Sequence, residues 1–189
     1  MTTKTAKFKP VSDDTLKKRN AAFNALPPMK KRVAVAKDVL LQIKIGKLIP
    51  ESFTYGEMSC AIESSDNLQL ILMEDGVSCN ACAKGAAVLA KARLGNEGYG
   101  NPGDAADEVS EEIFGGKLAW LLEVLFEDWT CDRNPLFTKG ETEAFLKYMG
   151  TLPDKIDHPE GRMIAIYQNI ITNRGRLKIG KFKFSWTQI

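Results

Sequence analysis

Apolar residues recur every three or four positions along most of this chain, which is the spacing of helices that bury one face. The clearest example is 117–129, where an apolar stripe alternates with acidic positions. A shorter apolar pattern lies at 68–74. The other long helical patterns occupy 12–26, 28–45, 78–94, 104–114, 138–149 and 159–172. We therefore predict a mainly α fold, a single compact domain of about six to seven helices.

Residues that begin and end helices stand at several of these boundaries. Ser12 followed by two aspartates is a good N-cap and acidic first turn, and Pro27-Pro28 ends that helix. Pro159 stands at a first-turn position, where its missing N–H costs nothing. These signals fix both expected ends of the first helix and the expected start of the last.

The remaining segments favour at most a small β element. The segment 48–62 has no helical period and is expected to be a loop with at most a short strand. The segment 176–186 alternates basic and apolar residues, as a half-buried strand does. One strand alone is not stable. It must pair with Phe53–Met58 or with another chain, or else remain a mobile basic tail.

Charge divides the chain into three parts. Residues 1–50 carry a net +9, residues 51–160 a net −13, and residues 161–189 a net +6, which together give the overall +2. We accordingly distinguish a basic N-terminal helix or arm (1–27), a helical core domain (28–175) and a basic C-terminal strand or tail (176–189). Basic ends can pair with the acidic middle, pair between subunits, or meet an acidic partner such as nucleic acid.

Hydropathy and cysteine usage indicate where the protein resides. The longest apolar run, 118–126, is interrupted by Glu123 and is far shorter than the roughly 20 residues of a membrane span. The first ten residues contain no apolar core of a secretory signal. Four cysteines without such a signal favour reduced thiols. We expect a cytoplasmic protein that does not associate with membranes.

Cys79 and Cys82 form a C-x-x-C pair in an alanine-rich segment that we expect to be the start of a helix. A helix N-terminus favours a thiolate, which permits a redox pair, but the strand-rich context of thioredoxin-like sites is missing. A zinc site would need Cys60, Cys131 or His158 as further ligands, and the chain has no second C-x-x-C. Both alternatives remain open. We favour a third, in which the two cysteines belong to the buried small face of the helix, with no cofactor.

Carboxylates give a second cluster of candidate residues. Glu123 and Glu127 stand one turn apart on the expected helix 117–129, beside Asp128. Helical di-metal sites add histidine in Glu-x-x-His, which is absent here, so we expect a solvated or partner-facing acidic surface. The chain also lacks a phosphate-binding P-loop, a G-x-S-x-G turn and an H-E-x-x-H pair. We expect no enzyme activity and no catalytic residues.

Four segments in order carry a resemblance: 31–40, then Cys79-Asn80-Ala81-Cys82-Ala83-Lys84-Gly85-Ala86, then 121–127 and 169–175. With its C-x-x-C-A-x-G-A motif, the region 30–176 resembles uncharacterised helical proteins of bacteriophages and bacteria. The resemblance implies a phage or prophage accessory protein in the cytoplasm of a bacterial host cell. That class includes inhibitors of host defence systems and regulators of host enzymes. It brings no catalytic residues to transfer.

Two functions follow as hypotheses. The first is a non-enzymatic protein-binding module that contacts a host protein, such as a defence system or host enzyme, through Glu111, Glu112, Glu127, Asp128, Tyr99 and Phe137. The alternative is nucleic-acid binding through Lys17, Lys18, Arg19, Lys30, Lys31, Arg32, Arg174, Arg176, Lys178, Lys181 and Lys183. For the alternative, aromatic residues of the C-terminal segment such as Phe182, Phe184 and Trp186 offer stacking surfaces. We rank the first hypothesis higher and also expect a homodimer, because the terminal strand lacks a partner and the charge blocks are complementary.

Overall fold

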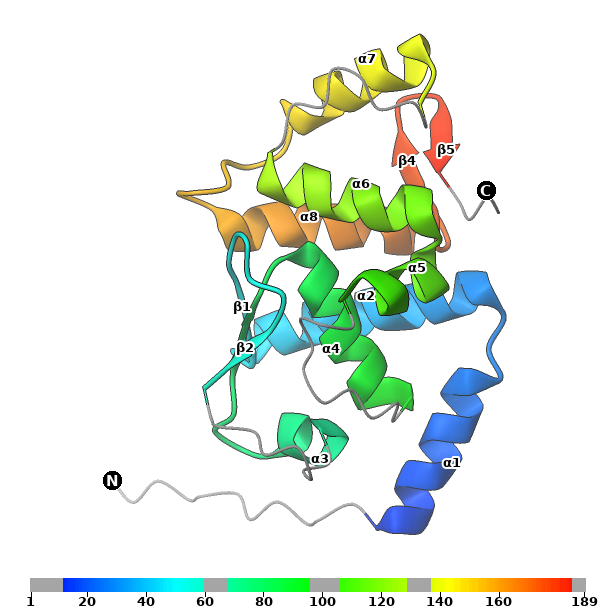
Figure 1. The fold of residues 1–189 in the computed structure, drawn as a ribbon, viewed down its shortest axis with the longest axis vertical. Coiled ribbons are helices and arrows are strands. Elements are labelled where there is room, and N and C mark those ends of the chain that lie inside the picture. Colours follow the sequence, from blue (N-terminus) through cyan, green and yellow to red (C-terminus); the bar gives the residue numbers. More distant parts are fainter. Residues whose placement is uncertain (1–11, 60–67, 96–105, 129–136, 185–189) are drawn as a thin grey trace.

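The structure is a computed structural model that describes residues 12–59, 68–95, 106–128 and 137–184. Within these ranges the fold is mainly helical, a compact single domain of eight helices with two small sheets (Figure 1), which confirms the predicted fold class. In the same ranges no helix is both long and apolar enough to cross a membrane. The helices are α1 (Asp13–Asn24), α2 (Pro28–Lys44), α3 (Leu68–Met73), α4 (Ala83–Gly95), α5 (Ala106–Phe114), α6 (Gly116–Glu127), α7 (Lys139–Met149) and α8 (Pro159–Thr172).

The helix boundaries follow the local signals in the sequence. The Ser12 hydroxyl accepts a hydrogen bond from the Thr15 N–H at 3.4 Å and so caps α1. At α7, Thr138 and Glu141 form a reciprocal capping box. Proline occupies the first turn of both α2 and α8. These ends are therefore fixed by short-range chemistry.

Helix α4 runs through the middle of the molecule and contacts α1, α2, α3, α5 and α6. Every residue from 83 to 93 is buried. Small side chains make this possible: a Cβ on Gly85 would lie 2.4 Å from the Tyr55 carbonyl oxygen, so only glycine allows the loop before β2 to approach. The expectation that small residues bring neighbouring elements close to this helix is confirmed.

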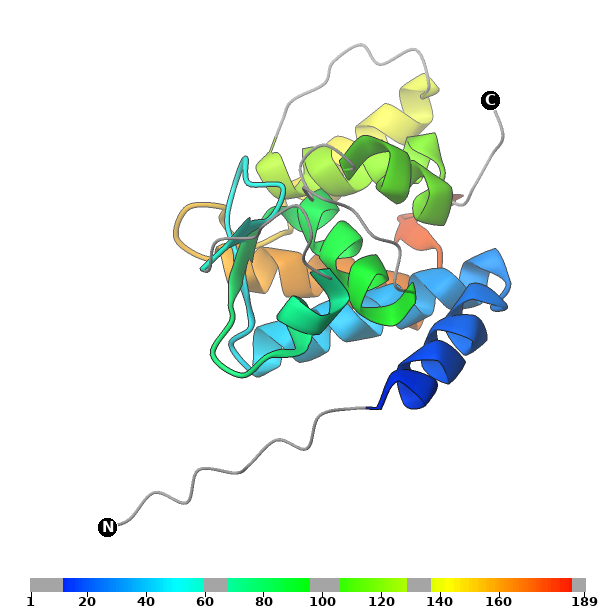
Figure 2. The same cartoon turned by 60° about the horizontal axis from the view of Figure 1, so that its bottom comes forward.

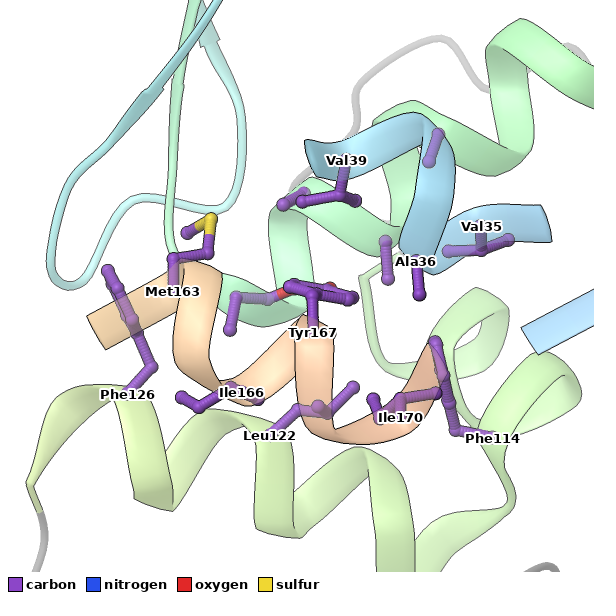
Figure 3. Packing of buried hydrophobic residues seen from close by; sticks show 14 of the residues in the cluster. Val35, Ala36, Val39, Phe114, Leu122, Phe126, Met163, Ile166, Tyr167 and Ile170 are labelled. Carbon is purple, nitrogen blue, oxygen red and sulfur yellow. The ribbon is translucent and has the colours of Figure 1, made fainter. Parts of the chain in front are cut away.

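A second part of the core lies where α8 packs between α2 and α6. Figure 3 shows Leu122 and Phe126 of α6 facing Ile166 and Ile170 of α8, with Tyr167 turned toward α2. All five side chains are fully buried. Each such side chain contributes about 1.5–3 kcal/mol of transfer free energy. This layer holds the end of α8 against the start of α2.

A three-stranded sheet, which the sequence did not reveal, covers one end of α4. It consists of β1 (Leu48–Pro50), β2 (Glu57–Met58) and β3 (Cys79–Ala81) in the order β1-β3-β2, with β1 parallel and β2 antiparallel to β3. The prediction that a helix begins near residue 78 is therefore wrong. Cys79 lies in the central strand and α4 starts only after Cys82, because β3 pairs on both sides and the Cys82 N–H donates to the Thr54 carbonyl at 2.5 Å.

The C-terminal segment forms a hairpin rather than one strand. β4 (Leu177–Ile179) and β5 (Phe182–Phe184) pair antiparallel through a turn in which Gly180 has φ +59°. Leu177, Ile179 and Phe184 face the core. The three pairings that were expected, with Phe53–Met58, with another chain, or none, are thus replaced by pairing within the segment. A homodimer was predicted partly because the terminal strand lacked a partner, and the hairpin removes that reason.

Candidate nucleic-acid interface

A close backbone contact joins two basic segments that lie far apart in the sequence. Gly175 follows α8 with φ +88°, and a Cβ there would lie 2.5 Å from the Met29 carbonyl oxygen at the start of α2. α2 and α8 lie side by side in Figures 1 and 2, with the hairpin following α8. Basic residues from the beginning of α2 and from the region after α8 therefore meet.

A polar hollow of about 260 Å³ opens at the end of α8. It is lined by Thr172, Asn173, Arg174, Arg176 and Lys183. Three of these side chains are cationic and the other two offer hydrogen-bonding groups. Among the residues that the structure describes, no carboxylate lines the hollow. Its chemistry suits a phosphate group, which guanidinium and ammonium groups bind through charge-assisted hydrogen bonds.

A second hollow of about 380 Å³ lies beside it along the seam between α2 and α8. Its apolar lining comes from Met29, Val33 and Ile171, and its basic lining comes from Lys30, Lys37 and Arg174. Arg174 lines both hollows. We call the five cations of the two hollows the basic face; they are Lys30, Lys37, Arg174, Arg176 and Lys183.

The basic face gathers positive charge at a cost to the folded protein. Lys183 stands directly opposite Lys178 in the hairpin, and like charges in such a pair are destabilising. Burial, together with the positive charge of the neighbouring Arg176, lowers the pKa of Arg32 to about 10. Arg174 itself adopts a left-handed φ of +57°, which side-chain-bearing residues seldom do. Observed strain of this kind motivates a functional hypothesis.

The other predicted nucleic-acid residues are placed differently. The α1 residues Lys17, Lys18 and Arg19 are exposed but line neither hollow. Lys31 lies over the Phe23 ring at 5.9 Å. Arg32 is fully buried and donates to the Ile113 carbonyl at 2.8 Å, so the expectation that it contacts a ligand at the surface is wrong. The hairpin residues Lys178 and Lys181 are exposed.

Lys37 was missed by the sequence reasoning. It lies inside α2, away from the basic cluster at residues 30–32 that attracted attention. A signal did exist: Met29, Val33 and Lys37 follow one another at intervals of four, which places them on one side of a helix.

Stacking on the hairpin aromatics is not available as predicted. Phe184 is buried, and its ring lies 5.8 Å from that of Phe137 and 6.5 Å from that of Phe182. Phe182 is only partly exposed, and Trp186 lies outside the part of the chain that the structure describes. The alternation of charge and aromatic rings anchors the hairpin to α7 and to the loop before it.

Cys79 and Cys82 are both buried. Burial raises the pKa of Cys82 to about 12, so the thiol is protonated at neutral pH and is a poor nucleophile. The other two cysteines, Cys60 and Cys131, lie outside the described ranges. Within those ranges, no group of three or more histidine, cysteine or carboxylate side chains is placed to hold a metal ion. Both Cys79 and Cys82 belong to the hydrophobic core cluster.

Glu123 and Glu127 are buried, which corrects the expectation of a solvated acidic surface. Helix α6 is enclosed on nearly all sides, so its acidic residues have partners inside the protein. One Glu123 oxygen pairs with the Lys84 ammonium at 2.9 Å and the other accepts from the Tyr55 hydroxyl at 2.5 Å. Glu127 accepts from the Phe53 N–H at 2.9 Å, while burial raises the pKa of its carboxyl group. The two carboxylates fix the loop before β2 onto α6, and Glu123 also joins α6 to α4.

Most of the residues predicted to bind a host protein are engaged within the molecule. Glu112 pairs with Lys91, and Asp128 pairs with Arg162 at 3.0 Å. The ring of Phe137 lies 5.2 Å from that of Trp120. Glu127 is buried as described above, whereas Glu111 is exposed on α5. Tyr99 lies outside the described ranges. The geometry therefore supports a binding role for this set of residues less than it supports one for the basic face.

Comparison with known proteins found no family model, no curated protein and no solved structure that matches this chain. The resemblance to phage and bacterial proteins, and the role as an accessory factor that it implies, stay predictions.

Proposed function

We propose that this protein binds nucleic acid through the basic face. The observation that carries the proposal is the convergence of cations from two distant segments on adjoining hollows, which no carboxylate of the described residues lines. Phosphate groups supply most of the binding free energy in such complexes, because cationic side chains release the counterions condensed on the strand. Five cations on one face match several successive phosphates.

Charge distribution within the chain supports the same function. No aspartate or glutamate follows Glu160 in the sequence, so α8 after its first turn and the hairpin carry no acidic side chain. On α2 the one carboxylate is Asp38, which is buried and paired with Arg93 at 2.7 Å. An approaching phosphate therefore meets little repulsion from these elements.

The proposal is tested by fluorescence anisotropy with labelled DNA and RNA oligonucleotides over a range of salt concentrations. The variant R174A/R176A/K183A removes three cations of the basic face. A matched control, K17A/K18A/R19A, removes the same charge from the exposed surface of α1. We expect the first variant to lose most of the affinity and to reduce the slope of log K against log salt by roughly 2 to 3 units, since each lost phosphate contact accounts for about 0.7–0.9.

The control should retain most of the wild-type affinity and slope. Equal losses in both variants would show that net charge alone attracts the strand and would remove the basic face as the site. Absence of binding by the wild-type protein at low salt would remove the function itself. Circular dichroism of both variants checks that the helical fold is intact.

A further inference from the structure

The two hollows of the basic face differ in chemistry as the two ends of a nucleotide do, because one end is a charged phosphate and the other is a flat apolar base. The polar hollow offers Arg174, Arg176 and Lys183, which suit a phosphate. The seam hollow offers the side chains of Met29, Val33 and Ile171, which suit the flat apolar surface of a base. Arg174 lines both, so the two hollows are adjacent.

The geometry points to single-stranded nucleic acid as the ligand, with an unpaired base on the apolar floor and the neighbouring phosphate in the polar hollow. This inference rests on the proposed function. In a duplex the bases are paired and stacked, so the flat faces of the bases are covered and cannot lie on the apolar floor. A single strand exposes the face of each base beside its own phosphate.

The size of the seam hollow agrees with this assignment. At about 380 Å³ it lies within the range of small-ligand sites, and three cations surround its three apolar side chains. Arginine also stacks on bases through its planar guanidinium group, and Arg174 is held at the junction by its left-handed backbone. These features give the base position an aliphatic floor and a stacking group without an exposed aromatic ring.

The test compares three ligands of equal length by fluorescence anisotropy with the wild-type protein: a single strand, the corresponding duplex, and a single strand in which every base is missing. We expect the natural single strand to bind roughly tenfold more tightly than the abasic strand and the duplex, which corresponds to about 1.4 kcal/mol. Equal affinity for the natural and abasic strands would overturn the inference, and so would equal or tighter binding of the duplex. Either result would leave the proposed function standing, whereas failure of all three ligands to bind would remove both.

A variant locates the base. Val33→Ser keeps the charge of the seam hollow but makes its floor polar, so we expect it to abolish the preference for the natural strand while the affinity for the abasic strand is unchanged. The matched control is Val77→Ser, since Val77 is also half-buried but lies outside both hollows. An unchanged preference in Val33→Ser would overturn the assignment of the base to this hollow. Displacement of the strand by an acidic leucine-rich peptide at a lower concentration than by unlabelled strand would instead assign the seam to a protein partner.

Discussion

Two sets of cations in this protein differ in whether they form ion pairs with carboxylates of the described residues. Helix α4 carries Lys84, Lys91 and Arg93 into the core, and each is paired with a carboxylate of α6, α5 or α2, respectively. In contrast, Arg174, Arg176 and Lys183 form no ion pair with any carboxylate in the described ranges. A cation can remain in the core only when the chain supplies its counter-charge. Under the proposed function, the counter-charge of the basic face comes from the phosphates of the bound strand.

The largest effect is expected from breaking a core pair. Lys84→Met leaves Glu123 buried without its counter-charge, so the free energy of unfolding should fall by about 3–5 kcal/mol. The same substitution at the basic face, Lys183→Met, removes no ion pair within the described ranges and should change stability by less than about 0.5 kcal/mol. Chemical denaturation of both variants measures the contrast. Similar losses at the two sites would abolish the distinction between the two sets.

The contact that assembles the basic face should be next in size. Gly175→Ala places a Cβ against the Met29 carbonyl at a backbone φ of +88°, so we expect a loss of about 1–3 kcal/mol from strain. The start of α2 and the end of α8 must also move apart, which should weaken strand binding. A suitable control is Gly46→Ala, which has φ +73° but no neighbouring atom within 4 Å. If the two variants lost equal affinity for nucleic acid, the contact would not be what assembles the face.

The effect of a buried carboxylate on stability should also depend on pH. Burial raises the pKa of Glu127 above its usual value, so ionising this carboxyl costs more in the folded than in the unfolded protein. The stability of the wild type relative to Glu127→Gln should therefore be greatest at low pH and should fall as pH rises above the usual pKa of glutamate. Denaturation curves at a series of pH values test the prediction, with the substitution of the exposed Glu111 by glutamine as a control. A difference that grows with pH would reverse the assigned sign.

The smallest effect should separate stability from binding. Lys183→Glu places opposite charges across the hairpin at the Lys178 pair, which should raise stability by about 0.2–1 kcal/mol. The same change reverses one charge of the basic face and should weaken strand binding. Thermal denaturation and anisotropy on the same sample measure both. If stability and affinity rose together, the like-charge pair would have no role in binding.

The helices were predictable because their signals are local. Ser12 and Pro159 act within one turn of the chain, and the apolar period of 117–129 is visible without any partner. The short strands were not predictable, since β1 and β3 are three residues each and exist only because they pair with one another. Because strand β3 could not be recognised, the C-x-x-C pair was predicted to lie at the start of a helix. Its burial was predicted correctly.

The candidate site was predictable only in its composition. The excess of lysine and arginine at the two ends of the chain suggested where cations come from, but not that Arg32 turns inward or that Lys37 turns outward. Both facts depend on how α2 packs against α5 and α8. The pairing of Glu123 and Glu127 inside the core likewise depends on contacts with Lys84 and Phe53, which are distant in sequence.

The contact between Gly175 and Met29 has a consequence for biosynthesis. The ribosome makes α2 early and makes α8 with its hairpin late. For most of translation the nascent chain therefore carries only Lys30 and Lys37, two of the five cations of the basic face. Such long-range contacts form only after both partners have emerged. If translation stopped before α8, the polypeptide would lack the assembled basic face. Under the proposed function, binding of a strand would therefore require that α8 and the hairpin have been synthesised.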